Sequence, residues 1–429
     1  MRKILSTILI LAMLLGLMTI PALADDPLEL TMFFPVNVGG TPAMCIDKMT
    51  AEFNAQNPDI QVKAVYTGNY DDTVTAIQTA IGTPGQPDLF VSLATQRFTM
   101  DDTGMAMHLD DIIAADPEGQ AFVDDFIDGF MLDSYVEGGH IISIPFQRST
   151  MVMFYNKDAF REVGLDPEQP PKNWEELVDY ATKLTNDKRF GVAIALNSGS
   201  AQWAFTGFSL QNCTNGVGLM SGDGKHVYFD TPENVEALQL WLDLQNKYHC
   251  MAPGIVQWTD MPTQFLAGEV AMIYHTTGNL TNIRKNANFD FGVCFLPAGR
   301  QWGAPTGGGN FYITKGISEE RQQAAWKYIK FMCSTENAAQ WSIDTGYVAT
   351  RESCYETETL KAYYDSFPQA LVAYQQLPYA QPELTTYNAA EMWRILNDTI
   401  QAAVTGEMTA EEALAAAQEQ GDDLLSDYQ

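Results

Sequence analysis

The stretch Leu28-Glu29-Leu30-Thr31-Met32-Phe33 (residues 28–33) alternates in polarity and then runs apolar, as a strand entering a sheet does. Helical spacing of apolar residues follows over 44–53, and a second alternating stretch over 60–65 predicts another strand. A second helix is predicted to begin near Asp71, and the continuous apolar run 89–91 predicts a third strand. This order of strand, helix, strand, helix and strand is typical of a parallel sheet with helices on its faces.

The same alternation returns further along the chain. Strands are predicted over 151–155, 190–195 and 271–274, with helices beginning near Asn173 and Asp230, and the C-terminal part is mostly helical. No low-complexity linker separates the two α/β units. Two units joined without a flexible connector commonly share a defined cleft and a hinge.

The N-terminal segment 1–24 predicts a cleaved secretory signal peptide. Arg2 and Lys3 form a short basic start, an apolar run follows, and Ala22 and Ala24 are small residues at the positions that a signal peptidase reads. A retained membrane anchor is the alternative, although the apolar run is short for a membrane span. We therefore expect an exported protein, in the periplasm or on the extracellular face after cleavage near Ala24.

The acidic composition excludes nucleic acid as a partner. The 429 residues carry 54 Asp and Glu against 24 Lys and Arg, which gives a formal net charge of −30. Binding to nucleic acid depends on Lys and Arg against phosphate, so this chain is expected to be repelled by it. The six cysteines are widely and irregularly spaced without a C-x-x-C pair, so neither a disulfide framework nor a metal site is predicted.

The search for catalytic chemistry is negative. The sequence contains no G-x-S-x-G, H-E-x-x-H, P-loop or glycine-rich dinucleotide motif, so we predict no catalytic residues and no cofactor. A glycosidase carboxylate pair is not recognisable among so many acids, and a secreted carbohydrate-active enzyme stays as a remote alternative. Gly307-Gly308-Gly309 has two interpretations, a close approach between chain segments or a backbone site for a ligand.

Aromatic residues near Gly, Pro, Asn or Thr favour a binding function. An aromatic ring stacks on the C–H face of a sugar or polyol, while neighbouring polar groups fix the hydroxyls. Core packing is the alternative for each of these residues. They are Phe33, Phe34, Tyr66, Tyr70, Trp203, Trp258, Trp302 and Tyr347.

A family resemblance rests on three consecutive stretches. Residues 145–150 (PFQRST), 154–160 (FYNKDAF) and 164–171 (GLDPEQPP) are similar to the extracellular solute-binding proteins of ABC importers. More narrowly, the chain resembles the glycerol-3-phosphate-binding branch of that family. The resemblance covers nearly all of the chain after the signal segment, and the other matching stretches are 68–70, 278–284, 336–339, 345–347 and 405–406.

The resemblance implies an α/β fold, a two-lobed clamp like that of periplasmic binding proteins, with discontinuous lobes, hinge strands and a helical C-terminal tail. The N-terminal lobe would comprise 25–147 and 308–342, and the C-terminal lobe 148–307 and 343–429. A small-molecule solute would bind between the lobes, and lobe closure would present the complex to ABC permease subunits in the membrane. A monomer is expected.

The ligand contacts of the family, carried over residue by residue, give a predicted binding site. The Gly308 N–H would approach a phosphate oxygen, and Arg394 would supply a fork of donors to an anion. For Arg394 the alternative is a surface charge on a helix that pairs with Glu391 or Asp398. The carried-over residues are Tyr70, Ser149, Thr276, Gly308, Tyr347 and Arg394.

Two positions depart from the family pattern. The family has a Glu after the third strand that holds ligand hydroxyls, and the matching residue here is Ala94. Arg148 stands where the family has a small residue, and it is expected to add positive charge beside Ser149. Arg148 and Trp203 complete the set of residues that we predict to bind the ligand. These departures indicate a changed or larger ligand that is still anionic, such as a glycerophosphodiester. The predicted ligand is therefore glycerol-3-phosphate or a glycerophosphodiester. A neutral sugar or oligosaccharide is the open alternative.

Overall fold

The computed structural model describes residues 26–35, 41–197 and 200–429. The predicted signal peptide and its cleavage point near Ala24 lie outside these residues. Within the described part of the chain, no helix has both the length and the apolar character that crossing a membrane requires.

The first α/β unit follows the pattern predicted from the N-terminal sequence. β1 (Leu28–Phe34) lies between β2 (Ile60–Tyr66) and β3 (Leu89–Leu93) and runs parallel to both. α2 (Thr41–Gln56) and α3 (Tyr70–Ala80) connect these strands. Alternate residues of β1 are buried, in agreement with its alternating sequence.

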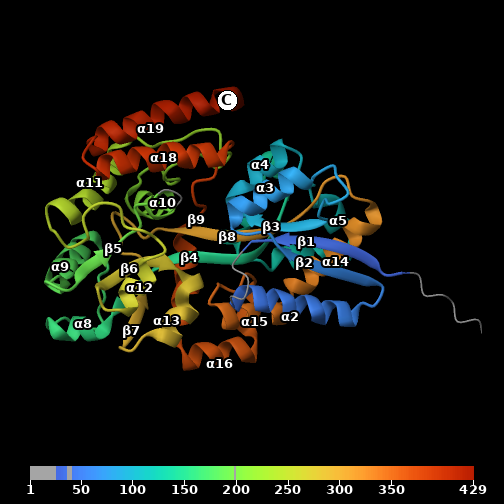
Figure 1. Ribbon diagram of the computed structural model, residues 1–429, viewed down its shortest axis with the longest axis horizontal. Helices are drawn as coiled ribbons and strands as arrows, with labels where there is room; N and C mark the ends of the chain where they lie inside the picture. Colours follow the sequence, from blue (N-terminus) through green and yellow to red (C-terminus); the bar gives the residue numbers. More distant parts are fainter. Residues whose placement is uncertain (1–25, 36–40, 198–199) are drawn as a thin grey trace, which may run out of the picture.

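Two long antiparallel strands carry the sheet from this first unit into a second one. β8 (Ala304–Ile313) pairs with β3 and with β4 (Ile144–Asn156), and β4 pairs in turn with β6 (Val270–Thr276). The strand order is β2-β1-β3-β8-β4-β6-β5, with β7 (Phe291–Cys294) on β4 and β9 (Ala380–Gln381) on β8. Figure 1 shows β4 and β8 running across the middle of the molecule, and we call them the crossing strands.

The second unit packs helices around β5 (Phe190–Ala193), β6 and β7. Its main helices are α9 (Trp174–Leu184), α10 (Ala201–Asn212) and α11 (Pro232–Asn246). α10 is buried along nearly its whole length because it lies against β8, α11 and α18 (Ala389–Val404).

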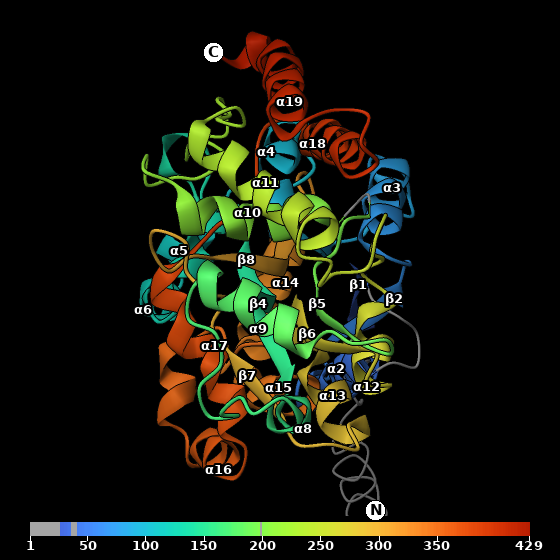
Figure 2. The ribbon, with the colours of Figure 1, turned by 90° about the vertical axis from the view of Figure 1, so that its left-hand side faces the viewer.

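The C-terminal part of the chain returns to both units. α14 (Glu319–Met332) and α15 (Thr335–Thr345) pack on α2 in the first unit. α18 and α19 (Ala410–Leu425) pack together on the second unit, at the top of the view in Figure 2. The predicted capping box from Thr409 to Glu412 starts α19. Each unit is therefore built from separate chain segments, while the predicted lobe bounds stay a prediction.

The other helices are short and complete the two units. These short helices are α4 (Arg97–Asp102), α5 (Asp110–Ala115), α6 (Gly119–Asp124), α7 (Asp128–Met131), α8 (Lys157–Glu162), α12 (Met261–Leu266), α13 (Leu280–Asn286), α16 (Glu358–Ser366) and α17 (Leu371–Gln376).

The six cysteines all lie in the described part of the chain, and each is a free thiol.

Candidate ligand-binding site

A cavity of about 250 Å³ lies beside the crossing strands and takes residues from both units. The first unit contributes the start of α3 and the end of β3, and the second contributes α10, the end of β6 and the segment around α18. A cavity shared in this way changes shape when the two units move relative to one another. Its described lining residues are Tyr70, Leu93, Ser149, Ser200, Gln202, Trp203, Trp258, Thr276, Gly308, Tyr347, Glu383 and Trp393.

The structure brings most of the predicted site residues together in this cavity. Those that line it are Tyr70, Ser149, Trp203, Thr276, Gly308 and Tyr347. They come from positions nearly three hundred residues apart in the sequence. Their contact with a ligand stays a prediction, whereas the two predicted arginines, Arg148 and Arg394, lie elsewhere.

Arg148 is buried behind the cavity rather than in it. Its Nη2 lies 2.6 Å from Asp133 Oδ2, its Nη1 donates to Asn310 Oδ1 at 3.1 Å, and its guanidinium stacks on the Phe130 ring. Successive side chains of a strand point to opposite faces, so Arg148 and its neighbour Ser149 point in opposite directions. The prediction that Arg148 adds positive charge to the cleft is therefore wrong, because Asp133 neutralises it on the other face.

Arg394 lies on the exposed side of α18, where it pairs with Glu391 at 2.6 Å and with Asp398 at 2.8 Å. The surface-charge alternative for Arg394 is thus confirmed, and its prediction as an anion-binding residue is wrong. Trp393, one residue earlier, lines the cavity instead. One step along a helix turns the side chain by about 100°, which is why neighbouring residues face different ways.

The tryptophans form apolar walls of the cavity, and the N–H groups of two of them are bonded to the backbone. Trp203 Nε1 donates to the Thr306 carbonyl at 3.0 Å, and Trp393 Nε1 donates to the Leu384 carbonyl at 2.8 Å. The rings of Trp203 and Trp258 lie 5.3 Å apart. With their N–H groups satisfied by the backbone, Trp203 and Trp393 offer ring surface to a ligand, the form of contact that sugar C–H faces use.

The hydroxyl groups of the cavity come from several elements. Tyr70 donates to Gln147 Oε1 at 3.2 Å, and Thr276 Oγ1 accepts from the Gly278 N–H at 3.1 Å. Burial raises the pKa of Tyr347 to about 12, so its phenol stays protonated. Like the other hydroxyls of the cavity, Tyr347 is a hydrogen-bond donor at physiological pH and can bond a ligand oxygen.

Gly308 occupies a backbone conformation that other residues rarely adopt, with φ of +93°. A Cβ there would collide with the Gln147 carbonyl oxygen on the neighbouring strand. A Cβ at Gly307 would also lie only 2.6 Å from the Trp203 ring. The close-approach interpretation of the glycine triplet is confirmed, and the ligand interpretation of Gly308 stays a prediction.

Sequence reasoning missed Glu383, which lines the cavity from the segment after β9. Its side chain is buried, and Gln202 Nε2 donates to its Oε1 at 3.3 Å. Burial first, and then the nearby charge of Asp133, raises the pKa of Glu383 to about 8. Ala94, the position at which the resemblance implies a Glu, is buried and does not line the cavity, so the carboxyl in the described lining is that of Glu383.

The described lining residues include no Lys and no Arg. The short stretches 36–40 and 198–199, which lie outside the described residues, contain neither amino acid in their sequence. Among the described lining residues, Glu383 is the one whose amino-acid type ordinarily carries a charge. An anionic group would therefore meet hydroxyl and N–H donors here instead of a cationic side chain.

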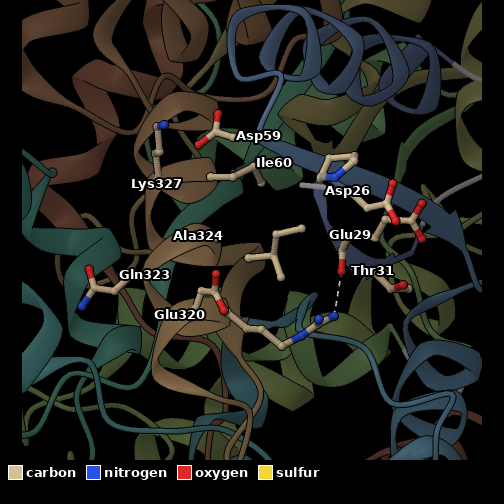
Figure 3. Close-up of a pocket in the computed structure, with 12 residues that line it drawn as sticks. Asp26, Glu29, Thr31, Asp59, Ile60, Glu320, Gln323, Ala324 and Lys327 are labelled. Atoms are coloured by element: carbon tan, nitrogen blue, oxygen red, sulfur yellow. Dashed lines mark hydrogen bonds between the residues drawn. The ribbon is translucent and has the colours of Figure 1, made fainter. Parts of the chain in front are cut away.

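A second, larger cavity of about 1090 Å³ lies at the far edge of the first unit and is shown in Figure 3. It is bordered by β1, β2 and α14, away from the crossing strands. Arg321 reaches into it but donates to the Glu29 carbonyl at 2.7 Å and also pairs with Asp88. Since its lining comes from one unit alone, it lacks the shared character of the cavity beside β4 and β8.

Comparisons with known proteins identify the class to which this fold and cavity belong. A family model described as bacterial extracellular solute-binding protein matches residues 48–368, and the chain belongs to this family. The chain is 30% identical over 413 residues to the sn-glycerol-3-phosphate-binding periplasmic protein UgpB of Salmonella paratyphi A, with 90% of each chain covered.

Solved structures show the same fold. UgpB from Mycobacterium tuberculosis in complex with glycerophosphocholine superposes with a TM-score of 0.80 at 24% identity, covering 94% of this chain and 98% of the other. The cyclic alpha-maltosyl-1,6-maltose binding protein from Arthrobacter globiformis also gives 0.80, at 22% identity, with 94% and 100% covered.

These findings confirm the predicted two-lobed α/β fold, with the two units as its lobes. They also confirm the predicted role, because solute-binding proteins of ABC importers bind small molecules and deliver them to membrane permeases. Membership of this family likewise supports the prediction that the protein is not an enzyme. As a family, these proteins act outside the cytoplasm, in agreement with the predicted export.

Proposed function

We propose that the protein captures a neutral polyhydroxylated solute, a sugar or oligosaccharide, in the cavity between its lobes. The observation that carries this proposal is the lining: three tryptophans, two tyrosines, hydroxyls and one buried carboxyl, with no Lys or Arg among the described lining residues. Aromatic faces and neutral hydrogen-bonding groups match the alternating C–H and O–H surface of a sugar. Dianionic phosphate is commonly held by Arg or Lys, and the described lining offers neither, although the N-terminal ends of α3 and α10 reach the cavity.

Glycerol-3-phosphate or a glycerophosphodiester is the second candidate. It is favoured by the relatives at 30% identity, which are named for binding sn-glycerol-3-phosphate. In that case the phosphate oxygens would accept from the Gly308 N–H and from the hydroxyls of Ser149, Thr276 and Tyr347. The predicted lobe bounds, the cleavage near Ala24 and the monomeric state belong to this same proposal.

A thermal-shift experiment separates the two ligand classes. The chain from Asp25 onward is heated with neutral mono- and oligosaccharides and, separately, with glycerol-3-phosphate and glycerophosphodiesters. A ligand that binds only the folded state stabilises it by about 2.7 kcal/mol at a hundred times its Kd. A rise in melting temperature with sugars alone supports the first candidate, and a rise with the phosphates alone supports the second and rejects the first.

A further inference from the structure

The segment that follows β9 places a carboxyl group in one corner of the cavity. Glu383 keeps 6% of its surface exposed and Gln202, which faces it from α10, keeps 2%. The Gln202 amide donates to the Glu383 carboxyl at 3.3 Å, and both residues line the cavity. A carboxyl and a side-chain amide therefore lie side by side at a surface that a ligand can reach.

The backbone that carries Glu383 is held by its neighbours. Thr385 Oγ1 donates to the Glu383 carbonyl at 2.7 Å, and Trp393 Nε1 bonds the carbonyl of the next residue, Leu384, at 2.8 Å. On the opposite side, Trp203 directly follows Gln202 in α10. The pair and both tryptophans line the same cavity, so a ligand there meets aromatic ring faces and polar groups together.

No Lys or Arg in the described part of the chain forms an ion pair with Glu383, and Gln202 is the described hydrogen-bond donor to its carboxyl. A carboxyl group has two oxygens and about four acceptor positions, so one amide bond at 3.3 Å uses only part of this capacity. Burying such a group without enough donors is unfavourable, and donors from a ligand would relieve this cost.

We propose that Glu383 and Gln202 form a pair that recognises two neighbouring hydroxyls of the ligand, so that the site selects compounds with a vicinal diol. The two Glu383 oxygens accept from the two hydroxyls, while the Gln202 amide holds the carboxyl in place. This pair supplies the acceptor that Ala94 does not. The inference rests on the proposed function, since it concerns which part of a polyhydroxylated ligand the cavity reads.

The test measures Kd by calorimetry on the full chain from Asp25 onward. The probes are the sugar or glycerol phosphate that binds the wild-type protein most tightly and its analogues that each lack one hydroxyl of a vicinal pair. Glu383→Gln keeps the shape of the side chain and weakens the acceptor. At about pH 9, above the raised pKa of Glu383, the carboxyl is ionised, and we expect this variant to weaken binding of the diol compound by at least about tenfold, the usual effect of losing hydrogen bonds to a charged group. The critical deoxy analogue should bind the wild-type and the variant alike.

Glu391→Gln is the matched control, because Glu391 lies on the exposed side of α18 and pairs with Arg394. It should leave every Kd unchanged, and the melting temperature of ligand-free Glu383→Gln should not fall. If Glu383→Gln loses affinity for the diol and the deoxy compounds equally, or loses affinity for neither, the inference is overturned while the capture function stands. Failure of the wild-type protein to bind any vicinal-diol compound overturns both the inference and the proposed ligand class.

Discussion

Asp133 and Glu383 are both buried carboxylates close to the crossing strands, and they differ in the partners around them. Asp133 pairs with Arg97 at 2.8 Å and with Arg148 at 2.6 Å, and it also accepts from the Thr306 hydroxyl at 3.0 Å. Glu383 lines the cavity with a side-chain amide as its described donor. The first carboxylate has its acceptor positions filled by the fold, whereas the second keeps positions that a ligand can fill.

This difference separates a structural role from a binding role without reference to any motif. Asp133, which follows α7, joins residues from α4 and both crossing strands, so it holds the lobes' shared framework in place. A buried carboxylate that is fully paired adds little to the chemistry of a cavity. One that is buried, unpaired by a cation and exposed to a cavity is a better candidate for ligand recognition.

Asp133→Ala should have the largest effect, and it should act on stability. The change leaves the Arg97 and Arg148 guanidinium groups buried without their shared carboxylate. Removing one partner from a buried ion pair costs about 3–5 kcal/mol. Urea denaturation of the ligand-free protein should show this loss, and Asp128→Ala, an exposed acid one turn earlier, should not. A loss below about 1 kcal/mol would contradict the structural role of Asp133.

Trp258→Ala should act on ligand affinity more than on stability. Trp258 lines the cavity and lies 5.3 Å from Trp203, so its removal takes away ring surface from the ligand. We expect Kd to rise about tenfold, the effect of losing roughly 1.4 kcal/mol of aromatic contact. Trp302→Ala is the control: sequence reasoning placed it with Trp258, but it packs on Phe295 instead. Equal effects of both variants on Kd would show that the cavity is misassigned.

The pH dependence of stability should reveal Glu383. Burial raises its pKa from the ordinary 4.5 to about 8, so folding favours the protonated carboxyl. Its stabilising contribution is complete below about pH 4.5 and is lost as the pH rises towards 8. The free energy of unfolding of the wild-type protein should therefore fall, relative to Glu383→Gln, across this window. Parallel curves for the two proteins would contradict the raised pKa.

Other groups near Glu383 should not produce this pH effect. Asp133 and Arg148 face it from behind the cavity and are paired with one another. Burial raises the pKa of Tyr70 well above 10, and burial lowers the pKa of His275, which stacks on Trp258, to about 3. Tyr70 and His275 therefore remain neutral between pH 4.5 and 8, and Glu383→Gln isolates the carboxyl.

The order of strands and helices could be predicted from sequence because it rests on local periodicity. The crossing strands were only half predicted. β4 was expected over 151–155, yet it begins at Ile144, because Gln147 to Thr150 are polar and give no strand pattern. These polar residues are buried with partners from elsewhere in the chain: Tyr70 donates to Gln147, Arg148 bonds Asp133 and Asn310, and Thr150 donates to the Pro305 carbonyl. Pairing of this kind is tertiary and leaves no local signal.

Most of the cavity residues that were predicted came from the family resemblance, which also supplied Arg394 wrongly, while Trp203 and Trp258 were singled out as aromatics. Tyr70, Ser149 and Tyr347 reached the cavity as predicted positions. Glu383 lies in an irregular segment without a motif, and its only indication in the sequence was the acceptor absent at Ala94. A missing group at one position predicts that some other group replaces it, but the identity of that group depends on the packing of the chain.

Arg394→Ala should have the smallest effect, and it tests the assignment of neighbouring helix positions. Trp393 is taken to face the ligand, so removing the Arg394 side chain should change Kd by less than about twofold, for sugars and for glycerol phosphates alike. The reason is that the exposed ion pairs of Arg394 with Glu391 and Asp398 contribute little. Trp393→Ala in parallel should weaken binding of the same compounds. The opposite result, a loss of glycerol phosphate binding in Arg394→Ala only, would mean that α18 turns on closure to bring a positive charge into the cavity. The lobes would then recognise an anion that the described lining does not explain, and Glu383 would no longer be its main specificity group.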